Sequence, residues 1–208
     1  MKVRIVSYSQ IPRNEGDETL QDLVAYCARV SNPANQNSPN DKLIKYLMDN
    51  EHWSPFEMVS VCLEIETTRD IARQILRHRS FSFQEFSQRY AVADTSFETR
   101  EARLQDLKNR QSSIETTDED LKSMWSAMQT SVAEKAEEAY KWALEHGIAK
   151  EQARAVLPEG MTPSRMYMNG TLRSWIHYIH LRSGNGTQKE HREVAVECAK
   201  VIGTIFPI

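Results

Sequence analysis

The chain has 208 residues, of which 40% are hydrophobic and 26% charged, and this composition is typical of one soluble globular domain over residues 1–208. Such a length is enough to bury a sizeable hydrophobic core. The formal net charge of −3 at pH 7 argues against a protein that binds nucleic acid or anionic membranes with its whole surface.

The first quarter of the chain predicts one strand and two helices. In chain order we expect a strand at 2–9, a helix at 17–30, a loop at 31–40, a helix at 41–50 and a turn at 52–57. Val3 and Ile5 alternate with polar residues in the strand, and Asn40 or Ser38 is expected to cap the second helix. Pro55 disfavours helix at the residue before it, which predicts the turn.

A second strand and a basic helix follow. Apolar residues alternate over 58–66, which predicts a strand, and the threonines at 67 and 68 are expected to cap a helix that runs to about Arg79. On that helix Arg69, Arg73 and Arg77 recur every four residues, away from the predicted buried stripe. Residues 80–90 lack a helical stripe and predict an ordered loop with a short strand.

The second half of the chain is mostly helical. We expect a polar connector with one short helix at 91–117, helices at 118–146, 150–157, 171–182 and 188–205, and an extended segment at 164–169. Thr117 is expected to cap the long helix, Gly147 to end it, and Trp125, Trp142 and its methionines to lie in the core. A small antiparallel sheet packed with several long helices, an α+β fold, is the predicted architecture.

The three cysteines predict a reducing cytoplasm. Cys27, Cys62 and Cys198 are odd in number and widely spaced, and there is neither a CxxC pair nor a zinc-ligand spacing. They are therefore expected to be buried thiols. The chain starts directly with a strand pattern instead of a signal segment, and no apolar run reaches membrane-spanning length.

Residues 77–90 carry the most informative chemistry. Arginines, a histidine, serines, one carboxylate and aromatic rings occur together there, which is the inventory needed to hold a nucleotide, a flavin, or both. Between Arg69 and Val92, five arginines against Asp70 and Glu85 give a local balance of +3 in an acidic protein. A cationic pocket for a small anionic ligand fits this contrast better than a broad basic surface.

Two interpretations of Arg77, His78 and Arg79 remain open from the residues alone. Cations at a helix C-terminus are stabilised by the helix dipole, without any ligand. Ser87 and Arg89 follow at a spacing that lets the loop fold back, and arginine with serine makes a good phosphate site. In that setting Glu85 is expected to be ionised, and either to pair with an arginine or to accept a hydrogen bond from a ligand hydroxyl.

Four blocks of the chain, in the same order, resemble the flavin-dependent thymidylate synthases. Arg77-His78-Arg79, followed after seven residues by Ser87, is similar to the signature of that family. The other three similar blocks are His52-Trp53-Ser54-Pro55-Phe56-Glu57, Ala153-Arg154-Ala155-Val156-Leu157-Pro158, and Leu172-Arg173-Ser174-Trp175-Ile176-His177 with Leu181-Arg182. Gln74, Glu85, Arg89 and Tyr90 also fit the family pattern.

The resemblance implies an enzyme with the fold of that family and a defined reaction. The reaction is the reductive methylation of dUMP to dTMP, in which methylenetetrahydrofolate gives the carbon, reduced FAD gives the hydride and NADPH reduces the flavin again. It also implies a homotetramer, and a chain of this length has little room for all these ligands, so sites shared between subunits are expected.

Site residues follow from the resemblance position by position. The implied dUMP contacts are Gln74, Arg77, Glu85, Ser87, Arg89, Arg154 and Arg182. The implied FAD contacts are Ser54, Arg77, His78, Arg79, Glu85, Thr171, Arg173 and His177. Arg182 is the implied catalytic residue, because a fixed guanidinium can stabilise negative charge on the uracil ring.

Nucleophilic and metal chemistry find little support in the sequence. No cysteine lies in the four blocks, and no Ser–His–acid arrangement surrounds Ser87, which we therefore assign to binding. His177 and His180 share a helix, but no carboxylate is placed to complete a metal site, so no metal is expected.

The chain departs from the family pattern at three positions. Thr171 stands where the family often has Asn, Gly186 where it commonly has His, and Met58 where many members have His. These departures concern the details of FAD binding.

Two other functions remain as alternatives. One is a member of the same family that binds nucleotide without turnover. The other is a binding module for single-stranded nucleic acid that uses the Arg- and Phe-rich segment at 77–90. The acidic net charge and the lack of a wider basic stripe argue against the second.

Overall fold

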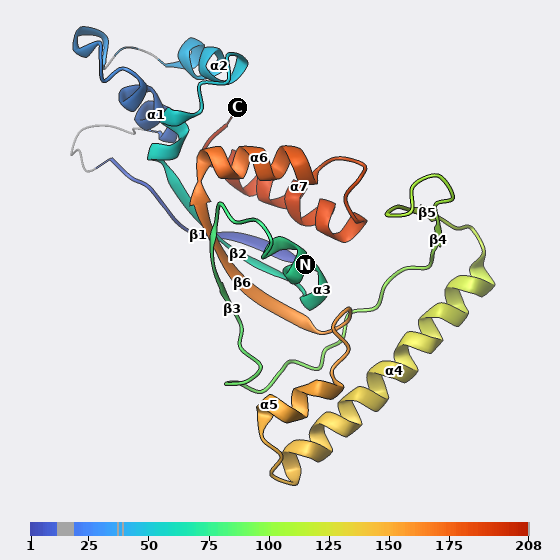
Figure 1. The fold of residues 1–208 in the computed structure, drawn as a ribbon. Helices are drawn as coiled ribbons and strands as arrows, with labels where there is room; N and C mark the ends of the chain where they lie inside the picture. The colour runs from blue at the N-terminus through green and yellow to red at the C-terminus, as the bar shows by residue number, and fades with distance from the viewer. Residues whose placement is uncertain (12–18, 37, 39, 208) are drawn as a thin grey trace.

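A computed structural model describes residues 1–11, 19–36, 38 and 40–207 of the chain. Its centre is one four-stranded sheet in the order β1 (Lys2–Tyr8), β2 (Ser60–Thr68), β6 (Pro163–Thr171) and β3 (Ser82–Glu85). All neighbouring strands are antiparallel. Figure 1 shows this sheet with helices gathered beside it, so the predicted α+β fold is confirmed.

Helices occupy most of the remaining chain. The α-helices are α1 (Leu20–Ala28), α2 (Asp41–Asp49), α3 (Arg69–Ile75), α4 (Glu119–Glu145), α5 (Lys150–Ala153), α6 (Leu172–Arg182) and α7 (Lys189–Gly203). Short 3-10 turns are η1 (Pro33–Asn35), η2 (Ser54–Met58) and η3 (Arg154–Val156), and a separate hairpin consists of β4 (Arg103–Gln105) and β5 (Ser113–Glu115). None of the helices within the described residues is long and apolar enough to span a membrane.

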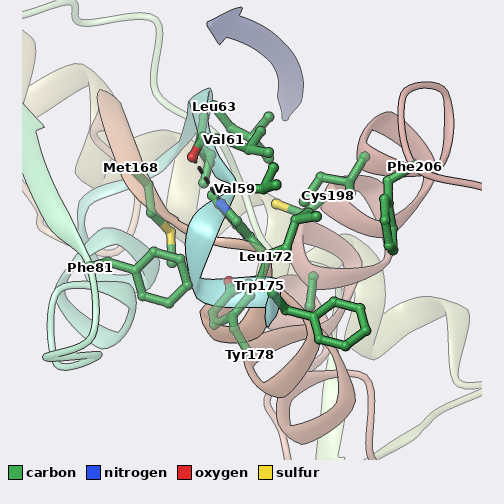
Figure 2. Packing of buried hydrophobic residues seen from close by; sticks show 14 of the residues in the cluster. Val59, Val61, Leu63, Phe81, Met168, Leu172, Trp175, Tyr178, Cys198 and Phe206 are labelled. Atoms are coloured by element: carbon green, nitrogen blue, oxygen red, sulfur yellow. Dashed lines mark hydrogen bonds between the residues drawn. The ribbon is translucent and has the colours of Figure 1, made fainter. Parts of the chain in front are cut away.

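The main core lies between β2, β6 and helices α6 and α7. Val61, Leu63 and Ile65 of the central strand β2 have no exposed surface. Figure 2 shows Trp175 of α6 packed beside this strand, and its indole Nε1 donates a hydrogen bond to the carbonyl of Val61 over 3.0 Å. Burying each large apolar side chain stabilises the fold by about 1.5–3 kcal/mol, so this core fixes α6 on the sheet.

The register of β6 brings distant blocks of the sequence together. Thr171, the last residue of β6, pairs with Ser60 of β2, which follows directly on the turn η2. Thr171 also caps α6, because its side chain accepts a hydrogen bond from the backbone N–H of Ser174 over 3.3 Å. At the other end of the strand, Met166 pairs with Glu85 of β3.

Helix α3 is shorter than the sequence predicts. It ends at Ile75, whereas we expected a helix to about Arg79. Backbone N–H groups of Arg77 and His78 donate three residues back, to Gln74 and Ile75, which tightens the chain into a turn. The turn delivers Phe81 into the core, where its ring lies 4.8 Å from that of Trp175 (ring centroids). Burial of Phe81 thus outweighs continuation of the helix.

The connector at 91–117 forms the β4–β5 hairpin, so the predicted short helix is wrong. The Asp106 carboxylate accepts hydrogen bonds from the backbone N–H groups of Lys108 (2.8 Å) and Asn109 (3.2 Å), and the Asn109 amide oxygen accepts one from Gln111 (3.1 Å). Such side-chain bonds to the backbone compete with helix and favour turns.

Two predicted helix caps are also different in the structure. Asp118, rather than Thr117, caps α4 and accepts a hydrogen bond from the backbone N–H of Leu121 over 2.9 Å. Asn40 occupies the N-cap position of α2 but makes no capping bond, because its amide donates to Asp22 of α1. Gly147 ends α4 with φ +77°, as predicted, a conformation that favours glycine.

Helix α4 buries a face other than the predicted one. Its buried residues are Gln129, Ala136, Tyr140 and Ala143, the last two of which pack in a small second core with Ala93 and Ala153. Trp125, Met128 and Trp142, which we expected in the core, are 43%, 61% and 54% exposed. Figure 1 shows α4 running beside α5 and away from the sheet, which explains why this part of its apolar surface has no cover in one chain.

Candidate active site

A histidine and an arginine that are 104 positions apart in the sequence form the centre of the candidate site. Arg182, the last residue of α6, donates a hydrogen bond from Nε to Nε2 of His78, in the turn after α3, over 2.9 Å. Partial burial, and secondly the charge of Arg182, lower the pKa of His78. The imidazole is therefore neutral at pH 7, and it can accept the arginine N–H. We call these two residues the histidine–arginine pair.

Behind this pair lies a line of buried and half-buried polar side chains. The Tyr178 hydroxyl is 3.1 Å from Nε2 of His191, whose Nδ1 is 3.3 Å from Oε1 of Gln74. Nε2 of Gln74 in turn donates to Oε1 of Gln188 over 2.8 Å. The Tyr178 ring also stands edge-on to that of His78, with centroids 4.9 Å apart. Of these residues, only His78 and Gln74 were predicted from the sequence as site residues.

One of the three missed residues, His191, did leave a signal in the sequence. His191 shares one face of α7 with the buried Val194, Ala195 and Cys198, at helical spacings of three, four and seven. A histidine on such an apolar face must find hydrogen-bond partners inside the protein. The tyrosine that it meets comes from another helix, however, and the spacing alone does not reveal which one.

Glu85 is held from two sides near the end of the sheet. The hydroxyl of Ser164 donates to its Oε1 over 2.8 Å, and Nη1 of Arg69 lies 3.5 Å from the same oxygen. Both members of the ion pair are largely buried, with side chains 10% (Arg69) and 16% (Glu85) exposed. Of the two roles expected for Glu85, the structure shows the pairing with an arginine, and the partner is Arg69 at the start of α3.

The other predicted phosphate contacts lie on exposed turns. Ser87 is in the turn after β3, where its carbonyl accepts hydrogen bonds from the backbone N–H groups of Tyr90 and Ala91. Arg89 lies 3.6 Å from the carboxylate of Glu151, and Nε of Arg154 donates to the carbonyl of the same residue over 3.3 Å. Arg89 and Arg154 therefore share Glu151 as a partner. We call Ser87, Arg89 and Arg154 the outer arginine group.

A third group joins the first and last blocks of the family pattern. Arg173 at the start of α6 forms an ion pair with Glu57 of η2. One turn along α6, the exposed ring of His177 lies 4.7 Å from the ring of Trp53. Ser54 and Thr171 belong to the same two segments, and Ser54 is exposed. Glu57 and Arg173 are 116 positions apart in the sequence, and the two segments meet because of the register between β2 and β6.

The structure therefore sorts the predicted residues into several groups. Within the described part of the chain, no hydrogen bond or ion pair links the outer arginine group to the histidine–arginine pair. Arg77 and Arg79 are exposed, and among the described residues their side chains have no charged partner. No set of three or more metal-binding side chains occurs in residues 1–11, 19–36, 38 and 40–207. Each group contains at least one guanidinium, and the histidine–arginine pair adds a neutral imidazole, which suits anionic, hydrogen-bonding ligands.

Comparison with known proteins identifies the family. The family model described as "Thymidylate synthase complementing protein" matches residues 16–208. The chain is 51% identical over 210 residues to the flavin-dependent thymidylate synthase of a Synechocystis species, and 48% identical over 209 residues to the probable flavin-dependent thymidylate synthase of Paramecium bursaria Chlorella virus 1. Each alignment covers 100% of this chain and 96% of the relative.

Solved structures share the fold of this chain. The UMP/dUMP methylase PolB of Streptomyces cacaoi bound with 5-Br dUMP superposes with a TM-score of 0.82 at 28% identity, over 98% of this chain and 90% of that one. Its structure with 5-Br UMP gives the same TM-score at 27% identity, over 98% and 89%. Sequence, fold and the arrangement of the four blocks agree, and the chain is an enzyme that belongs to the flavin-dependent thymidylate synthases.

Proposed function

We propose that the protein converts dUMP to dTMP by reductive methylation, with methylenetetrahydrofolate as carbon donor, FAD as hydride carrier and NADPH as reductant. The observation that carries this proposal is the histidine–arginine pair, since it holds a permanent positive charge beside a neutral imidazole at the meeting point of two family blocks. The family membership and the dUMP analogue bound to the solved methylase support the choice of substrate.

Arg182 is the residue to which we assign the catalytic role. Its Nε–H is taken by His78, so its terminal Nη groups are the donors left for a substrate. A guanidinium keeps its charge at any physiological pH and can stabilise negative charge that develops on the uracil ring. Such charge makes C5 of the ring nucleophilic. Because His78 holds Nε, the guanidinium does not need to be ordered when substrate binds.

The residues assigned to FAD fit an anionic, flat cofactor. Arg77 and Arg79, which have no charged partner among the described residues, suit a diphosphate. Exposed His177, backed by Trp53, offers an aromatic face, and Ser54, Thr171, Arg173, His78 and Glu85 complete the assigned set. When bound and reduced, FAD supplies the hydride of the reaction.

The outer arginine group, together with Gln74, Arg77, Glu85 and Arg182, is assigned to dUMP. Arg89 and Arg154 share Glu151 as a partner, and two guanidiniums with the hydroxyl of Ser87 would suit a phosphate. Oε2 of Glu85 accepts no hydrogen bond from the described side chains, so it remains open to a ligand hydroxyl.

We also propose that residues 1–208 form one domain, and that this domain works as a homotetramer in the cytoplasm with sites shared between subunits. The separation of the outer arginine group from the histidine–arginine pair supports sharing, because one chain alone does not bring the assigned dUMP contacts together. A row of exposed apolar residues on α4 supports assembly and would be covered by a second copy; it consists of Leu121, Met124, Trp125, Met128 and Val132.

Formation of dTMP by the purified protein tests the proposal. With dUMP, methylenetetrahydrofolate, FAD and NADPH all present, we expect dTMP to appear and tritium to leave dUMP labelled at C5. Leaving out the folate is the control, and it should abolish dTMP. A protein that binds FAD and dUMP but makes no dTMP would instead be a nucleotide-binding family member without turnover. Binding of single-stranded nucleic acid in the absence of any flavin would support the other alternative.

A further inference from the structure

The line of polar side chains behind the histidine–arginine pair continues to the surface. From Tyr178 it passes to His191 (3.1 Å), from His191 to Gln74 (3.3 Å), from Gln74 to Gln188 (2.8 Å) and from Gln188 to Glu190 (2.9 Å). We call these five residues the hydrogen-bond row. They come from α3, α6 and α7 and from the residue before α7, so the row ties three helices together.

At the Glu190 end of the row, the direction of the hydrogen bonds is fixed. Burial raises the pKa of Glu190, but hydrogen bonds from Arg103 and Gln188 outweigh this effect and lower the pKa below its usual value. Glu190 is thus ionised and can only accept hydrogen bonds. Gln188 must therefore point its Nε2 at Glu190, which leaves its Oε1 to accept from Nε2 of Gln74.

The same reasoning fixes the rest of the row. Since Gln74 donates from Nε2 to Gln188, the atom that it turns to His191 is the acceptor Oε1. His191 must then carry its proton on Nδ1, and its bare Nε2 must accept from the Tyr178 hydroxyl. Each of the five residues has one possible orientation, and each depends on its neighbours.

Burial makes this order costly to break. His191 has no exposed surface and Tyr178 is 2% exposed, so water cannot replace a lost partner. A buried polar group left unpaired is strongly unfavourable. Burial, and secondly the charge of Arg182, also lower the pKa of His191 to about 4, which keeps the imidazole in the neutral form that the row requires.

From this geometry we infer that His191 is a positioning residue for the substrate, which holds the amide of Gln74 in one orientation through its Nδ1–H. The inference rests on the proposed function, in which Gln74 contacts dUMP. With Oε1 held by His191 and one N–H of Nε2 held by Gln188, Gln74 presents its second N–H to a ligand acceptor, such as a carbonyl or phosphate oxygen. Without these two partners the amide group of Gln74 could rotate, and it would lose this rotational freedom each time a ligand binds.

Nitrogen NMR of the unmodified protein tests the row directly. With labelled histidine, the ring of His191 should show a protonated Nδ1 and a bare Nε2, without titration between pH 5 and pH 8. This measurement needs no activity and no variant. A proton on Nε2 instead, or on both nitrogens at neutral pH, would contradict the inference.

Two substitutions of His191 distinguish a role in positioning Gln74 from a role in packing alone. In His191→Asn the amide nitrogen occupies the place of Nδ1 and can still donate to Gln74, whereas in His191→Gln the amide group reaches the place of Nε2 and meets Tyr178 instead. We expect His191→Gln to weaken dUMP binding about tenfold, since one hydrogen bond is worth about 1–1.5 kcal/mol, and His191→Asn to weaken it clearly less.

The controls keep this test distinct from that of the proposed function. Calorimetric titration of the unmodified protein with dUMP comes first, and failure to bind would count against the function itself. Cys198→Ala, a change in the same buried face of α7, should lower the melting temperature without altering dUMP affinity. If His191→Gln binds dUMP as well as, or better than, His191→Asn, the inference is wrong.

Discussion

Arg182 and His78 lie 104 positions apart in the sequence, yet Nε of the arginine is 2.9 Å from Nε2 of the histidine. This bond joins the end of α6 to the turn that follows α3, and it relates two family blocks that sequence comparison treats separately. It also explains why the imidazole of His78 is neutral and why the guanidinium of Arg182 is held in place. A guanidinium beside a half-buried ring keeps the imidazole neutral, and the neutral ring in turn holds the guanidinium still.

Removing this arginine tests its assigned role. Arg182→Ala should reduce dTMP formation by at least about a hundredfold, because a fixed donor of this kind is typically worth 10²–10³ in rate. Flavin absorbance should be mostly retained, since Arg182 itself is not among the residues assigned to FAD. Steady-state kinetics and the visible spectrum of the same sample measure both effects. Near-normal turnover in Arg182→Ala would contradict the assignment, and Arg182→Lys, which keeps the charge but loses the planar fork, should recover only part of the rate.

The pKa of His191 predicts how stability depends on pH. Its value of about 4 lies below the usual 6.5, so the unfolded protein binds a proton on this residue at a pH where the folded protein does not. Stability from this residue is therefore complete above pH 6.5 and is lost as the pH falls towards 4. Between pH 7 and pH 5 we expect a loss of about 2 kcal/mol in the free energy of unfolding.

Urea unfolding at the two pH values measures this loss. His191→Phe is the matched variant, because it fills the same site with an aromatic ring that does not titrate. The difference in free energy of unfolding between the two proteins should change by about 2 kcal/mol from pH 7 to pH 5. An equal pH dependence in both proteins would show that His191 does not titrate as predicted.

Gly170 is expected to tolerate no side chain. A Cβ at this position in β6 would lie 2.4 Å from Cδ1 and 2.6 Å from Cε1 of Phe81, whose ring packs against Trp175 and Tyr178. Gly170→Ala should therefore cost about 1–3 kcal/mol of stability by overpacking and push the segment around Phe81 outward. Gly203→Ala, where a Cβ would meet no atom within 4 Å, is the control and should be neutral or stabilising. Equal melting temperatures for the two variants would contradict the packing described here.

The exposed apolar row on α4 predicts a variant that fails to assemble. Met128→Glu places a charge in the middle of the row, and burying an unpaired charge is costly, so the proposed oligomer should dissociate. Light scattering gives the mass. Ser123→Glu, on the opposite side of the same exposed helix turn, should leave the assembly intact. If the unmodified protein is a monomer, or if both variants behave alike, the row on α4 is not the contact.

Local patterns were enough to predict most elements but not their ends. The alternation in β2 and the stripe in α6 are strong, because these elements face the main core. The end of α3 was missed because burial of Phe81, a tertiary effect, draws the chain out of the helix. The long helix α4 was predicted correctly as a helix, but its buried face was not. Apolar residues with helical spacing do not reveal whether the same chain or a second one covers them.

The candidate site, like the fold, could be predicted from the sequence only in part. The resemblance to the family was sufficient to name Arg182, His78 and Glu85 as candidate site residues. The partners of these residues came from the fold: Arg69 for Glu85, and the row through His191 for Gln74. A buried histidine on an apolar face is a signal that a partner exists, whereas the choice of partner depends on how α6 and α7 pack.

The absorbance spectrum of the purified protein, recorded before and after addition of dUMP, tests the central claim most directly. We predict flavin absorbance, present as isolated or gained with added FAD, that changes when dUMP binds beside it. A protein that takes up no FAD, and whose spectrum dUMP leaves unaltered, would contradict the account.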